Sequence, residues 1–180
     1  MEDVVSVGDI PPANRPDAGG SFRLRPEAHV KIVALHEYWQ RVAPGPGRLP
    51  GRQHIDPIDI PKLLANIWML DVVDPTGDSH SRRFRFRLIG TALQRVGLTA
   101  RVGDHVDQFI DEKARATTLE ELHRVVTTRS PVWFRGQAFM RHDSKAFELE
   151  RPLLPLAGDG TTVDIILCLT VFYTTRGEPI

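Results

Sequence analysis

The chain has 180 residues, of which 41% are hydrophobic and 26% are charged, as is typical of a globular domain with extensions. Its 23 Lys and Arg residues balance its 23 Asp and Glu residues, which argues against a broad attraction to nucleic acid or to an anionic membrane. The single cysteine, Cys168, excludes an intramolecular disulfide, and no apolar run approaches the roughly 18 residues needed to cross a bilayer. We therefore expect a cytoplasmic protein with no nucleic-acid partner and no membrane insertion.

The N-terminal part is predicted to hold a tail and one amphipathic helix. Residues 1–21 are rich in Pro, Gly and Asp without a sustained period, which is typical of a flexible tail. Residues 22–47 are assigned to a helix that begins at Pro26, since a proline suits the first turn, and to a hinge at Pro44–Gly47. Along the helix runs a stripe of apolar residues at helical spacing: Ala28, Ile32, Leu35, Trp39 and Val42.

Two interpretations of this stripe are open. It can pack on the chain's own core, or it can form the interface of a homodimer or of a complex with a regulatory protein. In the second case Ile32, Leu35 and Trp39 are the contact residues, with Trp39 as a bulky aromatic anchor. The hinge at Pro44–Gly47 separates the helix from the rest of the chain and would allow this second arrangement.

Residues 48–176 are predicted to form one domain. Asp56 and Asp59 lie just ahead of prolines and are interpreted as helix caps, although paired carboxylates can also serve acid–base or metal chemistry. The further elements that we expect are a buried strand at 67–73, an arginine-rich strand that Gly90 ends, a short helix at 92–96, a helix from Asp111 to about Thr128, and strands at 132–140, 146–156 and 163–174.

This order of elements indicates an α+β fold. The strands at 67–73 and 163–174 are apolar on both faces, so we expect them to pair in the centre of the sheet. The arginine-rich strand instead has one apolar face and one face that carries Arg83, Arg85 and Arg87. Such a cationic face could bind a phosphate or an acidic partner, but we interpret it as a solvated strand that its charge protects against edge-to-edge pairing.

Residues with catalytic or cofactor chemistry are sparse. Cys168 lies among apolar residues of the last strand and is interpreted as a buried structural thiol. His123 lies at the margin of the apolar side of the long helix and is interpreted as a surface or hydrogen-bonded histidine rather than a haem ligand. The sequence has no phosphate-binding glycine motif and no GxSxG motif, and neither Ser130 nor Thr91 has a histidine nearby in the sequence. We therefore expect no enzyme activity, no metal site and no cofactor.

The chain resembles the bacterial PAS_5 family of PAS-like domains in three elements. These are HIDPIDIPKLLANIWMLDVVD, RFRFRLIGTALQRVGLTARVGDHVDQF and the later acidic and apolar strand that precedes "PL". The resemblance covers roughly Leu35 to Phe172. It implies an α+β, PAS-like fold, which is a five-stranded antiparallel sheet with helices on one face and an N-terminal flanking helix.

The resemblance also implies a sensory or protein-interaction role in bacterial signalling, without a known ligand or reaction. Apolar side chains on the concave face of the sheet form either a filled core or a ligand cavity, and both remain open. The candidate pocket residues are Phe86, Leu88, Phe109, Leu122, Val126 and Phe139. We expect a cytoplasmic sensor or adaptor that acts in trans through contacts with a protein partner. A receptor with a true small-molecule pocket is the first alternative, and an enzyme of unknown reaction is a more distant one.

Overall fold

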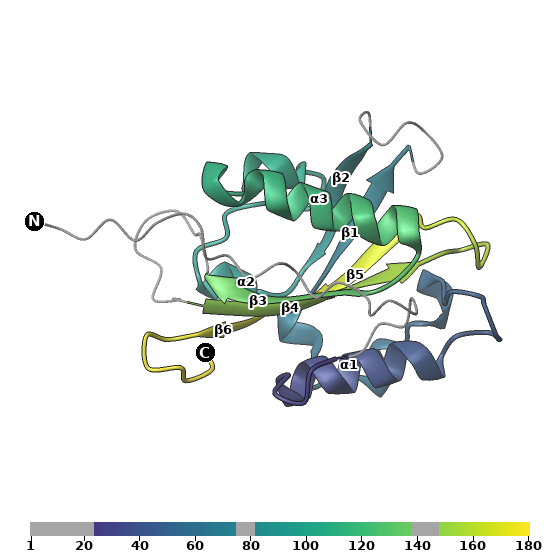
Figure 1. Cartoon of the computed structure of the whole chain (residues 1–180), viewed down its shortest axis with the longest axis horizontal. Helices are drawn as coiled ribbons and strands as arrows, with labels where there is room; N and C mark the ends of the chain where they lie inside the picture. Colours follow the sequence, from purple (N-terminus) through teal and green to yellow (C-terminus); the bar gives the residue numbers. More distant parts are fainter. Residues whose placement is uncertain (1–23, 75–81, 138–147) are drawn as a thin grey trace, which may run out of the picture.

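The computed structural model describes residues 24–74, 82–137 and 148–180. The flexible tail predicted for residues 1–21 and the pocket candidate Phe139 lie outside the described residues. The described part of the chain is an antiparallel sheet with a helix packed on each face (Figure 1).

Within the described residues the sheet consists of β1 (Ile67–Val73), β2 (Arg83–Ile89), β3 (Val132–Gln137), β4 (Glu148–Leu156), β5 (Ile165–Leu169) and β6 (Val171–Tyr173). Their order is β2-β1-β5-β4-β3, and β6 pairs with β4. β5 lies in the centre, between β1 and β4, and every one of its residues is buried. The predicted α+β class and the predicted central pairing of the last strand with β1 are therefore confirmed.

The last strand is not continuous over 163–174 as predicted, because it divides at Thr170. The N–H of Thr170 donates to the carbonyl oxygen of Asn66, 3.0 Å away, at the point where β1 begins. Beyond Thr170 the chain has passed the end of β1, and β6 continues beside β4 in the register that β5 has with β4. The strand is thus divided where it loses one of its two neighbours.

The helical elements are α1 (Val30–Arg41), α2 (Thr91–Arg95), α3 (Glu112–Thr128) and the 3-10 turns η1 (Arg52–His54), η2 (Pro57–Asp59), η3 (Leu64–Asn66) and η4 (Val106–Gln108). Figure 1 shows α3 on one side of the sheet and α1 on the other. At η2 the predicted cap is present, since the side chain of Asp56 accepts a hydrogen bond from the N–H of Ile58 and Pro57 follows it. Asp59 was also predicted to be a helix cap, but it is the last residue of this same turn.

Alternation along the strands divides the core into two clusters. Trp68, Leu70 and Val72 of β1 point to the side of α3, where they join the cluster that we call the α3-side core. Ile67 and Met69 point to the side of α1 and belong to the α1-side core. Both faces of the central strands are therefore covered, which explains why their sequences are apolar throughout.

α1 begins four residues later than predicted. The chain makes a turn after Pro26, and the first helical residue is Val30. His29 is the N-cap, and its Nδ1 accepts a hydrogen bond from the N–H of Lys31 over 3.1 Å. The N–H of His29 itself donates to the carboxylate of Glu150 in β4, so a contact that is distant in sequence decides where the helix starts.

Candidate functional site

Two small cavities lie between α3, η4 and the sheet. One has a volume of about 130 Å³ and reaches α3 and β3, where Ala114, Thr117 and Phe134 line it. The other has a volume of about 110 Å³ and reaches deeper toward β1 and β2, where Trp68 and Phe86 line it. The two share five lining residues, which are Phe109, Ile110, Thr118, Leu149 and Arg151. Each cavity has room for a few water molecules or one small ring.

A buried ion pair lies in the wall of the larger cavity. Nη2 of Arg151 in β4 lies 2.8 Å from Oε2 of Glu121 in α3, and the two side chains are only 12% and 3% exposed. The same Nη2 donates to Oγ1 of Thr118, one turn earlier in α3, over 3.3 Å. Phe134, which faces Arg151 across β3 and β4, places its ring 5.3 Å from the guanidinium carbon. These contacts join α3 to the sheet at the cavity.

Two polar atoms of this ion pair have no hydrogen-bond partner among the described residues. They are Oε1 of Glu121 and Nε of Arg151, and both are buried. Buried polar groups in folded proteins are nearly always paired, because an unpaired one costs about 1–3 kcal/mol. The ion pair therefore leaves one acceptor and one donor unused, and both atoms are enclosed by the surrounding side chains.

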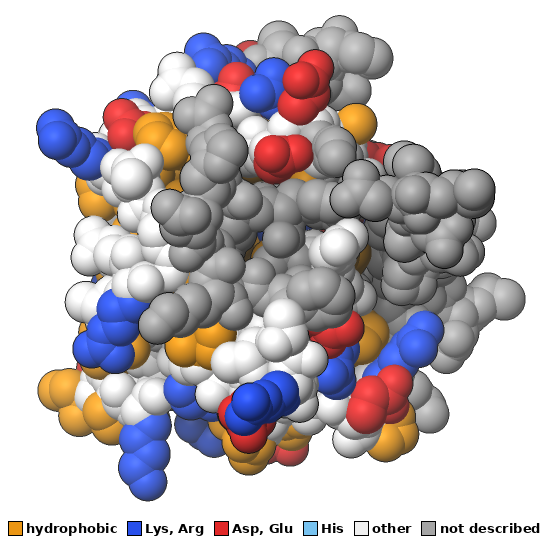
Figure 2. All heavy atoms as spheres, turned by 90° about the vertical axis from the view of Figure 1, so that its left-hand side faces the viewer, with side chains coloured by type: hydrophobic (Ala, Val, Ile, Leu, Met, Phe, Trp, Pro, Cys, Tyr) orange, Lys and Arg blue, Asp and Glu red, His pale blue; other side chains and the backbone are white. Residues whose placement is uncertain are grey.

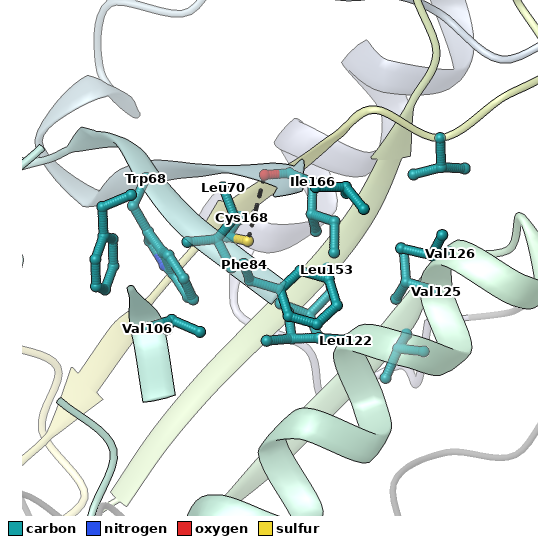
Figure 3. Close-up of a cluster of buried hydrophobic side chains, with 14 of the residues drawn as sticks. Trp68, Leu70, Phe84, Val106, Leu122, Val125, Val126, Leu153, Ile166 and Cys168 are labelled. Carbon is teal, nitrogen blue, oxygen red and sulfur yellow. Dashed lines mark hydrogen bonds between the residues drawn. The ribbon is translucent and has the colours of Figure 1, made fainter. Parts of the chain in front are cut away.

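Two of the predicted pocket residues line the cavities. Phe109 lines both of them, and Phe86 lines the smaller one. Their rings are in edge contact, with centroids 6.2 Å apart. Leu122 and Val126 instead lie in the α3-side core, where Figure 3 shows them among the packed apolar side chains under α3.

Leu88 requires a correction, because it does not lie on the α3 side of the sheet. A β-bulge opposite Met69 and Leu70 inserts Arg87 as an extra residue in β2, so Leu88 pairs with Met69 on the α1 side. Its side chain is 37% exposed. Strict alternation from Phe86 predicts the opposite face, and a bulge of this kind reverses that prediction.

The sequence analysis missed Glu121, Thr118 and Arg151. A signal for them exists in retrospect, because Thr118, Glu121 and Val125 follow helical spacing on the side of α3 that packs on the sheet. A carboxylate within such a stripe is rarely buried without a partner. Arg151 was not predicted because its strand also carries the buried Glu150. The sequence alone does not say which of these two adjacent charged residues faces which side of the sheet.

The α1 stripe is used within the chain. Ile32 and Leu35 are fully buried in the α1-side core, and Trp39 donates from Nε1 to the carbonyl oxygen of Pro155 over 2.9 Å. This placement corrects the expectation that the Pro44–Gly47 hinge frees the helix for a partner. Once helical spacing has produced an apolar face, the open α1 side of the central strands is the nearest surface that can cover it.

Glu150 anchors the N-terminus of α1. This fully buried carboxylate accepts hydrogen bonds from Nε1 of Trp133 over 2.9 Å, from the hydroxyl of Tyr173 over 2.7 Å and from the N–H of His29 over 3.0 Å. Burial, together with the bond to Glu150, raises the pKa of Tyr173 well above its usual range. Three donors satisfy Glu150, so this cluster has a structural role.

The arginines of β2 are paired with acids. Arg85 and Arg87 lie 3.3 and 3.0 Å from the carboxylate of Asp71, and Arg83 lies 3.4 Å from Asp107. On the face drawn in Figure 2, Lys and Arg side chains are interspersed with Asp and Glu side chains. The three ion pairs agree with the interpretation of a solvated strand. Part of its outer edge is covered by a loop as well, since the N–H of Phe86 donates to the carbonyl oxygen of Asp104 and the N–H of Gly103 donates to that of Phe86.

Cys168 and His123 both pack against neighbouring residues of the fold. Cys168 is fully buried, burial raises the pKa of its thiol far above the usual range, and its Sγ contacts the carbonyl oxygen of Ile166 at 3.7 Å (Figure 3). The ring of His123 meets Phe84 edge-on, with centroids 5.1 Å apart. In the part of the chain that the structure describes, no three His, Cys, Asp or Glu side chains gather as a metal site, and no helix is long and apolar enough to span a bilayer.

The chain matches a known protein family over most of its length. The family model PAS_5, described as a PAS domain, matches residues 27–170. The comparison with curated proteins found no match. The family match begins just before α1 and ends at Thr170, so it includes the buried ion pair and the residues that line the two cavities except Phe172.

Proposed function

The chain belongs to the PAS_5 family of PAS domains, and from this membership and the two adjoining cavities we propose that it is a sensor that binds a small molecule between α3 and the sheet. PAS domains are generally sensory rather than catalytic, so no reaction is proposed for it. We place the sensor in the cytoplasm of a bacterium, since its single cysteine is consistent with a reducing compartment.

The observation that carries this proposal is the composition of the cavity wall. Ligand sites in proteins are concave and mostly apolar, with a few polar groups that orient the ligand. Here Phe109, Ile110 and Leu149 supply the apolar surface, and Arg151 and Glu121 supply the polar groups. The volume of about 130 Å³ is below that of drug-sized sites, which restricts the ligand to a small molecule.

A pair of variants on α3 tests this function. Ala114 lines the larger cavity, whereas Ala116, two residues along the same helix, is exposed. Ala114→Phe should fill the cavity, and Ala116→Phe is the matched control. In a thermal-shift screen of small metabolites, we expect compounds that raise Tm by several degrees in the wild type and in Ala116→Phe, but not in Ala114→Phe. The proposal fails if no compound stabilises the wild type, or if Ala114→Phe retains every shift.

A second candidate function is an adaptor that acts as a homodimer. The outer side of α1 and the segment from Ile58 to Leu63 form an open groove of about 740 Å³. Ile58 and Val30 line it and are 84% and 73% exposed, which is unusual for large apolar side chains. A two-fold dimer needs a self-complementary patch, and this groove combines exposed apolar side chains with charged residues of both signs, which are Lys31, Glu37, Arg41, Asp59 and Lys62.

Light scattering on two variants tests the dimer. Ile58→Asp should give a folded monomer, because a charge at the groove opposes burial against a second copy. Val102→Asp is the control, since Val102 is 66% exposed and does not line the groove. A wild-type chain that is monomeric at high concentration would exclude this candidate, and so would an Ile58→Asp variant that remains dimeric.

A further inference from the structure

The smaller of the two cavities, which we call the inner cavity, is lined mostly by apolar side chains. Its floor consists of buried side chains from β1, β2 and β6, which are Trp68, Phe86 and Phe172. Its rim consists of half-buried side chains, among them Leu98 and Leu149. A ligand that passes this partly exposed rim therefore meets apolar surface on the floor.

The polar side chains of the inner cavity are engaged within the fold. Nε1 of Trp68 donates to Oγ1 of Thr170 over 2.9 Å. Oγ1 of Thr118 accepts from Nη2 of Arg151, and the same Nη2 donates to Glu121. A polar ligand would therefore exchange its hydrogen bonds to water for few new ones, whereas an apolar ligand loses nothing by leaving water.

The charge of the wall favours a neutral ligand over an ion. Clustered aromatic rings can bind quaternary ammonium ions, and the ring of Phe86 lies between those of Trp68 and Phe109, with centroids 6.0 and 6.2 Å away. Among the described lining residues, however, none is acidic, and a cation would lie near the guanidinium of Arg151. An anion gains little either, because Glu121 already neutralises Arg151.

We propose that the inner cavity binds a small, uncharged, apolar molecule, no larger than one hydrocarbon ring with a short substituent. Its volume of about 110 Å³ is somewhat below the roughly 150 Å³ of an engineered apolar cavity that binds benzene. The adjoining larger cavity, which shares five lining residues with it, has room for the substituent. This inference rests on the proposed sensory function and specifies the class of ligand that the sensor takes.

Three probes of similar size test the ligand class on the full wild-type chain. Benzene is neutral and apolar, phenol adds a hydroxyl group, and tetramethylammonium is a cation. In NMR titrations that follow methyl signals, we expect a Kd for benzene that is about tenfold lower, or more, than for either other probe, because the wall does not replace their lost bonds to water. The signals that shift should include those of Leu93, Leu98 and Val106, which line the inner cavity but not the larger one.

Three variants locate the binding site of benzene. Leu98→Trp should fill the inner cavity from its rim and abolish binding. Val102→Trp is the matched control, since Val102 lies in the same loop between α2 and η4, is 66% exposed and lines neither cavity. Ala114→Phe should also retain binding, because Ala114 lines only the larger cavity. The titrations of the wild type remain decisive if a variant does not fold.

The outcomes also separate this inference from the proposed function. If phenol or tetramethylammonium binds the wild type as tightly as benzene, the ligand class is wrong while the cavity remains a binding site. If benzene does not bind, or binds Leu98→Trp as it binds the wild type, the inner cavity is not its site and the inference is wrong. The metabolite screen with Ala114→Phe then decides whether the sensory proposal fails as well, because that variant alters the larger cavity alone.

Discussion

Glu150 and Arg151 are neighbours in β4, and they point to opposite faces of the sheet. Glu150 lies under the N-terminus of α1 and receives three hydrogen bonds from neutral donors. Arg151 lies under α3 and leaves its Nε without a partner. Two adjacent buried charges thus have different roles, because the first is fully satisfied by the fold and the second is not.

His29 beside Glu150 makes stability depend on pH. Burial lowers its pKa below the ordinary value of 6.5, and its Nδ1 must be unprotonated to accept from the N–H of Lys31. Below 6.5 the unfolded chain binds a proton that the folded chain does not, so this stability is present above pH 6.5 and is lost as the pH falls.

The variant His29→Asn tests this dependence, since asparagine also caps helices but does not titrate. Urea denaturation between about pH 7 and about pH 5 should show that the wild type loses about 1 kcal/mol more than the variant. A residual slope is expected in both, because burial also lowers the pKa of His36. Equal slopes in the two proteins would show that the His29 cap does not titrate as proposed.

At the scale of elements, periodicity predicted which side of each helix is apolar but not what covers it. The stripe of α1 was correctly identified, whereas its packing on the α1-side core depends on a sheet whose second face is also apolar. The start of α1 is set by Glu150, which lies 121 residues away. Long-range contacts of this kind leave no local pattern in the sequence.

The same limit explains the partial success at the candidate site. Phe86 and Phe109 were predicted because an apolar strand face and an aromatic at a loop end are local signals. The bulge that turns Leu88 to the other face depends on the pairing of β2 with β1. The pair of Arg151 and Glu121 depends on the packing of α3 on β4, so neither of these two features could be predicted from its own segment.

The packing of α1 predicts the effect of a charge at Leu35. Leu35→Asp places an unpaired carboxylate among buried apolar side chains and should cost about 3 kcal/mol or more. Gln40→Asp is the matched control, because Gln40 is an exposed residue of the same helix that does not line the groove, so it should change stability by about 0.5 kcal/mol. Denaturant titrations of both variants provide the measurement. A stable, folded Leu35→Asp variant that has only lost self-association would show instead that the stripe is an interface.

At the scale of the whole molecule, the sheet is a central layer between two cores. β5 contributes to both, since Ile166 and Cys168 belong to the α3-side core while Leu167 and Leu169 belong to the α1-side core. The edge strand β2 differs, because one of its faces carries arginines that are paired with Asp71 and Asp107. Sensitivity to substitution should therefore fall from the centre of the sheet to this edge.

Two leucine substitutions on the α1 side measure this gradient. Leu167 is fully buried in β5, so Leu167→Asp leaves a carboxylate without water or a cation and should cost about 3 kcal/mol or more. Leu88 is 37% exposed in the edge strand β2, and its neighbour Arg87 supplies a positive charge, so Leu88→Asp should cost about 1 kcal/mol or less. Free energies of unfolding from guanidinium titrations decide between them. Because the substitution is the same and both positions face the α1 side, equal losses would mean that Leu88 is as enclosed as the central strand, and the assignment of the α1-side face of β2 as a partly exposed, charged surface would be wrong.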